Sequence, residues 1–259
     1  AGLFKKVVIS DYISLNFVDR IFDNPTLYTG FENLMGVYAY ALQIYCDFSG
    51  YSDMAIGIAL LLGFRFNINF DSPYKSTSIT EFWRRWHISL SSWFREYLYI
   101  PLGGNRCSKP RWMLNLFLVW AATGIWHGAS WNYLLWGLYF FALLMLEKLF
   151  LLPWLEKAPR ALQHVYTLFL VVVSWAIFAI EDFTQLQGYL SVMFGLAGAP
   201  LTNGDFVYYL RSYLPILCVA GALLVYTFFN LMGTPSADQV KMTIYQVIRT
   251  MFYTTNGIF

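Results

Sequence analysis

The sequence predicts an all-α, polytopic integral membrane protein with broken or re-entrant helices and an interfacial amphipathic helix. Of its 259 residues, 58% are hydrophobic and only 12% are charged, and the mean hydropathy is +0.49. Soluble domains usually carry about twice this charged fraction. This apolar composition makes membrane lipid the expected environment. The net charge of +2, without a dense basic run, argues against a nucleic-acid partner.

Six apolar segments recur along the chain: Leu34–Cys46, Met54–Phe64, Met113–Trp126, Tyr133–Phe150, Leu162–Ile180 and Tyr213–Met232. Only the last three approach the ~20 residues that cross a bilayer as a helix. The shorter segments predict broken, tilted or re-entrant helices, whose free backbone groups need protein or a cavity around them. We expect a single membrane domain over 1–259 that is a fragment of a longer protein.

Loop charges predict an orientation. Eight Lys and Arg but only three Asp and Glu fall between Arg65 and Arg111, so this segment is expected in the cytoplasm. Alternation along the chain then places the turn around His127 away from the cytoplasm. His164, at the start of the fifth apolar segment, returns to the cytoplasmic side, where a structural role is expected.

His127 lies in Trp126-His127-Gly128, between two strongly apolar segments. An ionisable residue inside a membrane is costly, which makes it a functional-site hypothesis. A structural interpretation also stays open, because polar groups at helix–helix turns bind neighbouring backbone groups.

The segment from Ile79 to Leu98 has the pattern of an amphipathic helix on the cytoplasmic side. At helical spacing one face is apolar and rich in aromatic residues: Ile79, Phe82, Trp83, Trp86, Leu90, Trp93, Phe94, Tyr97 and Leu98. Such a helix lies at the membrane interface or packs on the protein's own cytoplasmic side. His87 falls at the edge of the apolar face, so we expect it to point toward protein or lipid.

A polar cluster occupies Cys46–Asp53, between two short apolar segments. It predicts a helix break, with Asp53 as the N-cap of a helix from Met54. Asp47 has no such local role. The cluster is either a solvated loop or the lining of a cavity.

Three ordered blocks resemble the membrane-bound O-acyltransferase family, especially its bacterial alginate O-acetyltransferase-like branch. They are Cys46–Ala55, Glu81–Arg106 and Trp126–Gly137. All lie within roughly the first 150 residues, and the rest of the chain is similar only in its hydrophobic character. The resemblance implies that this is the C-terminal part of such a protein, without the family's N-terminal helices.

The resemblance implies an enzyme, an O-acetyltransferase that takes acetyl from cytoplasmic acetyl-CoA across the membrane to O-acetylate an extracytoplasmic polysaccharide such as alginate. His127 and His87 are the expected catalytic residues, since a neutral imidazole can accept a proton from a hydroxyl. The remaining expected site residues are Asp47, Ser49, Tyr51, Asp53, Trp126 and Asn132 along a substrate channel, and Arg84, Arg85 and Arg95 at the donor phosphates. The three arginines equally fit a positive-inside flank. No metal and no resident cofactor are expected.

The two histidines are expected at different depths. From the cytoplasmic side His127 ends a segment of about 14 residues, or ~21 Å at helical rise, whereas His87 belongs to the cytoplasmic flank. They would form an inner and outer pair along the transfer path.

The resemblance also implies a multi-pass protein of the bacterial cytoplasmic (inner) membrane with an extracytoplasmic SGNH-type acetyltransferase partner and with polysaccharide synthesis or export proteins. Within the family, D-alanyl transfer to teichoic acid from an acyl carrier protein is the alternative. Outside it, a solute transporter or an inactive scaffold remains; no paired internal repeat supports a transporter.

Overall fold

The computed structural model describes residues 1–198, 200–202, 204, 208, 211, 212 and 214. Contacts divide the chain into one unit over Ala1–Leu201 and another over Thr202–Phe259, and the helices between Phe4 and Met193 lie in the first. The predicted all-α class agrees with the described residues, which contain helices and no strands. Apart from Leu214, the predicted segment Tyr213–Met232 lies outside them.

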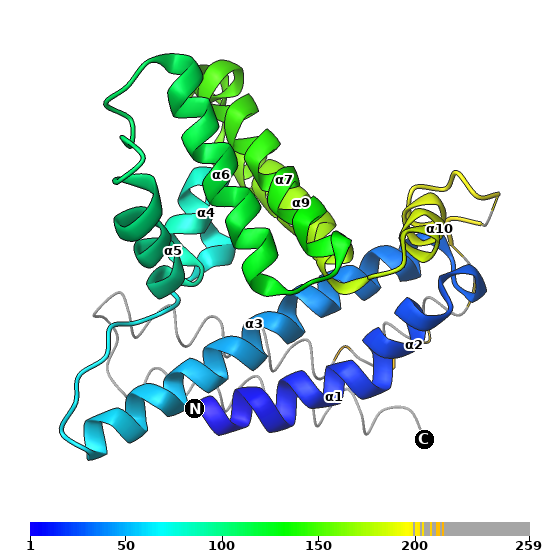
Figure 1. The fold of residues 1–259 in the computed structure, drawn as a ribbon. Coiled ribbons are helices and arrows are strands. Elements are labelled where there is room, and N and C mark those ends of the chain that lie inside the picture. Colours follow the sequence, from blue (N-terminus) through cyan, green and yellow to red (C-terminus); the bar gives the residue numbers. More distant parts are fainter. Residues whose placement is uncertain (199, 203, 205–207, 209–210, 213, 215–259) are drawn as a thin grey trace. The chain divides into compact units, whose positions relative to one another are not determined.

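The N-terminal part is one helical run packed along a long helix (Figure 1). The run comprises a π-helix over Phe4–Ser10, α1 (Asp11–Ile13), a π-helix over Ser14–Val18 and α2 (Asp19–Asp23), followed by a 3-10 turn over Pro25–Leu27. The long helix is α3 (Gly30–Leu61), which begins with a capping box between Thr29 and Glu32.

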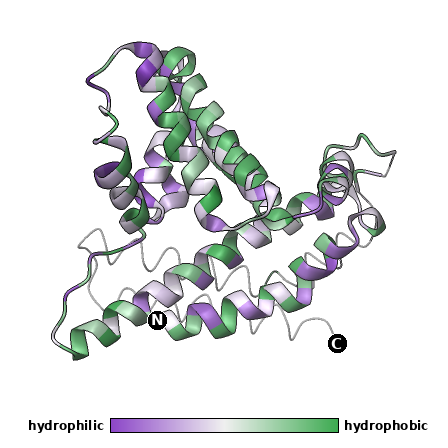
Figure 2. Cartoon of the chain, viewed as in Figure 1, coloured by the Kyte–Doolittle hydropathy of each residue, from purple (hydrophilic) through white to green (hydrophobic). Residues whose placement is uncertain are grey.

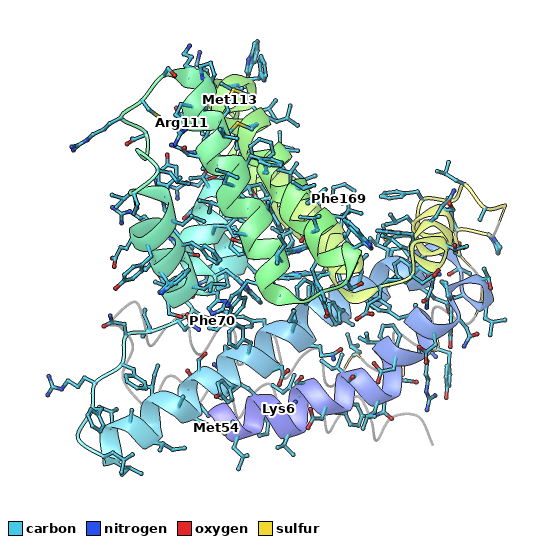
Figure 3. The ribbon with its side chains drawn as sticks, in the orientation of Figure 1. Lys6, Met54, Phe70, Arg111, Met113 and Phe169 are labelled. Atoms are coloured by element: carbon cyan, nitrogen blue, oxygen red, sulfur yellow. The ribbon has the colours of Figure 1, made fainter. Side chains whose placement is uncertain are left out.

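The predicted helix break over Cys46–Asp53 is wrong, because α3 continues through it. Lys5 and Lys6 of the N-terminal run pair with Asp53 and Asp47, each at 2.8 Å. Figure 3 labels Lys6 beside α3, close to Met54. The carboxylates are therefore ion-paired along a helix face, and Asp53 is no N-cap.

Small residues let the two helices approach each other closely. A methyl group at Gly50 would lie 2.7 Å from the carbonyl oxygen of Gly2, and one at Gly2 would lie 2.5 Å from that of Gly50. The polar, small-residue block is thus the contact surface for the N-terminal run.

The helices α6 (Lys109–His127), α7 (Trp131–Leu146) and α9 (Arg160–Ala179) form a bundle (Figure 1). A π-helical turn over Glu147–Leu151 and α8 (Leu152–Leu155) extend α7. Two helical stretches, Trp131–Leu155 and Arg160–Ala179, are long and apolar enough to cross a membrane, as predicted from Tyr133–Phe150 and Leu162–Ile180. In Figure 2 most of the ribbon of these helices has the colour of hydrophobic residues. The unit ends with α10 (Phe183–Met193).

The single helix expected over 79–98 is also wrong. The chain forms α4 (Ile79–Arg85), α5 (Ile88–Phe94) and a π-helical turn over Arg95–Tyr99, preceded by a 3-10 turn over Pro73–Lys75. The break falls at Trp86 and His87, and His87 has the left-handed φ of 47°. The preceding loop pairs with the break through Asp71 N to Arg85 O and Ile88 N to Asn69 O.

A buried carboxylate fixes the start of α4. Glu147, 0% exposed, accepts hydrogen bonds from the backbone N–H of Ile79 at 2.6 Å and of Thr80 at 3.1 Å, and from the Thr80 hydroxyl at 3.1 Å. The first N–H groups of a helix have no partner within it and carry partial positive charge, so a carboxylate there is stabilising. This contact ties α4 to the end of α7.

Replacing the buried carboxylate should destabilise the complete protein. In Glu147→Gln, the amide NH₂ meets backbone donors, and we expect a loss of about 2 kcal/mol in unfolding free energy. Glu156→Gln, at an exposed site just after α8, is the control and should change little. Thermal unfolding in detergent measures both, and equal midpoints for the two variants would contradict the anchoring role.

Candidate active site

A cavity of about 380 Å³ lies between α3, the α4–α5 break and the ends of α6, α7 and α9. Its lining is mainly aromatic: Ile44, Asp47, Phe48, Tyr51, Trp86, His87, Trp126, His127, Trp136, Trp175 and Phe178. It therefore brings together side chains from helices that are far apart in the sequence.

Both histidines line this one cavity, so the predicted separation of His87 and His127 is wrong. Burial and the nearby His127 imidazole lower the pKa of His87 to about 4, which makes His87 neutral at pH 7. His87 is 9% exposed, as its place at the edge of the apolar face predicted. Within the described part of the chain, no group hydrogen-bonds to the ring nitrogens of either residue, which leaves them available to a substrate.

Aromatic rings fix the position of each imidazole. The His127 ring centroid lies 5.0 Å from Trp126, 5.0 Å from Trp136 and 5.2 Å from Phe178, in edge-to-face contacts. His87 is held edge-to-face by Phe48 at 4.6 Å. Phe70, labelled in Figure 3, lies behind Phe48 at 5.0 Å. Such walls restrict water and leave few polar groups besides the imidazoles.

Asp47 and Tyr51 provide polar groups on the α3 side of the cavity. The Asp47 carboxylate is bound by Lys6 at 2.8 Å, and Lys6 also contacts Asp11 at 3.0 Å. The hydrogen bonds that Lys6 donates to these two carboxylates, first to Asp47 and then to Asp11, raise the pKa of Lys6. The N-terminal run thus orients a charged group at the cavity.

Three predicted channel residues do not line the cavity. Asp53 pairs with Lys5, and Ser49 is 2% exposed, with a hydroxyl that makes no hydrogen bond to any described residue. Asn132 is fully buried and donates to the carbonyl oxygen of Phe178 at 2.8 Å. Asn132 therefore holds Phe178, which lines the cavity, without lining the cavity itself.

A second, larger cavity has a volume of about 630 Å³. Two of the three predicted donor-binding arginines line it, and the third does not. Arg84 and Arg95 line it together with Lys148, which was not expected from the sequence. Arg85 does not; it forms ion pairs with Glu81 at 2.9 Å and Asp71 at 3.2 Å. Burial alone would raise the pKa of Glu81, but hydrogen bonds from Thr77 and Arg85 lower it. Because Arg85 binds both Glu81 of α4 and Asp71 of the preceding loop, it holds the chain together at the α4–α5 break.

The sequence model of the MBOAT (membrane-bound O-acyltransferase) family matches residues 4–186, which include both histidines and both cavities. The chain belongs to this family.

The chain is also similar to named proteins. The chain is 42% identical over 234 residues to the probable alginate O-acetylase AlgI of Azotobacter vinelandii, covering 90% of this chain and 45% of the relative. It is 41% identical over 205 residues to the peptidoglycan O-acetyltransferase of Helicobacter pylori, covering 78% and 39%. It is 34% identical over 149 residues to the teichoic acid D-alanyltransferase of Bacillus subtilis, covering 54% and 37%. The chain thus spans about half or less of each relative's length.

Of the aromatic residues that line the cavity of this O-acyltransferase family member, Tyr51 and Trp126 were predicted as channel residues, but Trp136, Trp175 and Phe178 were not. Trp136, Trp175 and Phe178 lie within apolar helices, where large side chains at helical spacing equally predict an ordinary core. Only their contacts with His127 and the cavity distinguish them.

Glycines hold the turn that carries His127. A methyl group at Gly124 would lie 2.5 Å from the carbonyl oxygen of Tyr133, and one at Gly128 would lie 2.6 Å from the Tyr133 ring. At Gly137 a methyl would collide with the carbonyl oxygen of Trp120. The backbones of α6 and α7 are therefore in direct contact, which fixes His127 and Trp136 relative to each other.

Gly137→Ala should force α6 and α7 apart. Because the obstacle is backbone rather than a flexible side chain, we expect a loss of about 1–3 kcal/mol in unfolding free energy. Gly188→Ala in α10 is the control, since a methyl there meets nothing within 4 Å and alanine favours a helix by up to about 1 kcal/mol. Chemical or thermal unfolding of the complete protein compares them, and a Gly137→Ala variant as stable as Gly188→Ala would contradict the close packing.

Proposed function

We propose that this chain carries the acyl-transfer centre of a membrane O-acetyltransferase that modifies an extracytoplasmic polysaccharide such as alginate. The proposal rests on the observation that His87 and His127 line the same cavity, together with Asp47 and Tyr51. The relatives named as O-acetylases support acetyl as the group transferred, since they match over more of the chain than the D-alanyltransferase does.

His127 is the general base in this proposal. Its free ring nitrogen takes the proton from an acceptor hydroxyl as the oxygen attacks the acetyl carbonyl, and the same proton passes to the leaving thiolate. Neutral His87, on the same cavity, orients the acceptor or the donor by a hydrogen bond. The aromatic walls limit competing hydrolysis by restricting water.

Acetyl-CoA is the proposed donor, used as a substrate rather than as a resident cofactor. Its phosphates carry negative charges that the cations of the second cavity, Arg84, Arg95 and Lys148, complement. Arg85 has no part in this proposal, because its guanidinium is taken by Glu81 and Asp71.

The proposed setting is the bacterial inner membrane, with the α4–α5 region on the cytoplasmic side and the acceptor outside. An SGNH-type partner and the polysaccharide synthesis or export proteins complete delivery in this proposal. Two helical stretches that are long and apolar enough to cross a membrane support the membrane setting of this proposal.

The test uses the complete protein together with its SGNH-type partner in vesicles, with [¹⁴C]acetyl-CoA inside and the acceptor polysaccharide outside. Wild type should label the polymer, and His127→Ala should lower the rate at least about 100-fold, because base catalysis contributes roughly 10²–10⁴-fold. His164→Ala is the control and should retain activity; its ring contacts the Ser76 carbonyl, away from the cavity. Unchanged labelling by His127→Ala would overturn the proposal, as would a wild type that accepts only D-alanyl carrier protein.

A further inference from the structure

Trp136 lies directly against the candidate base. Its side chain is 1% exposed, it lines the 380 Å³ cavity, and its ring meets His127 edge-to-face at 5.0 Å and 84°. The neighbouring Gly137 packs on the α6 backbone, so the position of this indole relative to His127 is fixed by the hairpin itself.

The indole N–H of Trp136 is buried and donates no hydrogen bond among the described residues, including to the adjoining His127 imidazole. Its neighbours are the rings of Trp83, Phe140, Phe178 and Trp175, which offer faces and edges rather than oxygen atoms. Buried donors in folded proteins are nearly always paired, so an unpaired one at a cavity wall indicates a ligand atom.

Other indoles of the cavity are placed differently. Among the described residues, the Trp175 N–H also lacks a hydrogen bond of good geometry, but the Tyr74 phenol interacts with it as an acceptor. Trp126 is 56% exposed, so its N–H is not committed to the cavity. Within the described part of the chain, Trp136 is therefore the indole that contacts His127 and has a buried N–H without a hydrogen bond.

We propose that the Trp136 indole N–H donates a hydrogen bond to the carbonyl oxygen of the transferred acyl group. This inference rests on the acyl transfer proposed above. As the acceptor oxygen bonds to the carbonyl carbon, the C=O π pair moves onto the oxygen, which becomes an oxyanion, and His127 takes the hydroxyl proton. The intermediate then collapses, the C–S bond breaks, and the thiolate receives that proton. A donor fixed in advance stabilises the oxyanion more than the uncharged carbonyl.

Trp136→Phe in the complete protein removes the N–H and keeps an aromatic ring. We expect kcat for acetyl transfer to fall on the order of 100-fold, with the KM for acetyl-CoA nearly unchanged, since the bond strengthens in the transition state. Phe140→Leu is the matched control. Phe140 packs on Trp136, lines neither of the two cavities and carries no polar group. The substitution removes part of the aromatic cluster, so it should lower stability but retain kcat. Trp136→Gln, which restores an N–H donor, should recover part of the kcat.

Wild-type kcat in Trp136→Phe would overturn the inference, as would an equal loss of kcat in Phe140→Leu at matched unfolding midpoints. A result in which His127→Ala abolishes transfer but Trp136→Phe does not rejects only the oxyanion role. Full activity of His127→Ala rejects the proposed function itself, so the two failures are distinguishable.

Discussion

The site depends first on one buried charge. Glu147, at the end of α7, binds the opening N–H groups of α4, so α4 starts at a fixed point on the bundle. After two turns α4 ends, and the left-handed backbone of His87 turns the chain into α5. Arg85, tied to Asp71 and Glu81, holds the preceding loop against that break. The position of His87 is thus set from both ends of a short helix, which has little stability of its own.

His127 is positioned by a different means. The α6–α7 hairpin closes backbone to backbone at Gly124 and Gly137, and Tyr133 packs on Gly128. A close glycine contact leaves few alternative arrangements, so the turn carries His127 and Trp136 as a rigid pair. Asn132, through the Phe178 carbonyl, ties the same turn to α9. Two independent devices, a capped short helix and a glycine hairpin, therefore converge on a single aromatic cavity.

Local sequence was informative where chemistry is local. Apolar length predicted the helices over 131–155 and 160–179, and a histidine between two apolar segments drew attention to His127, which lines the aromatic cavity. The local sequence failed to predict the structure where a residue far away in the chain determines the local conformation. The acids Asp47 and Asp53 suggested a helix break only because their partners, Lys6 and Lys5, lie far earlier in the chain, 48 residues earlier for Lys5, and were not recognised. The histidines were separated by counting helical rise along α6, a count that ignores how the broken α4–α5 segment returns His87 to the same cavity. Arg84 and Arg85 are adjacent in sequence, yet only one lines the second cavity.

The shared cavity of His87 and His127 is tested most directly by cross-linking in the complete protein. Cys46→Ala, Cys107→Ala and Cys218→Ala remove the cysteines of this chain, and His87→Cys and His127→Cys are then added. A short bis-methanethiosulfonate reagent should link this pair in membranes, detected as a joined peptide by mass spectrometry. Leu61→Cys with His127→Cys is the control, since Leu61 ends α3 ten residues, or about 15 Å, beyond Tyr51. A link in the first pair alone is the predicted result. Single labelling of both cysteines without a link, or equal linking of both pairs, would contradict a shared cavity.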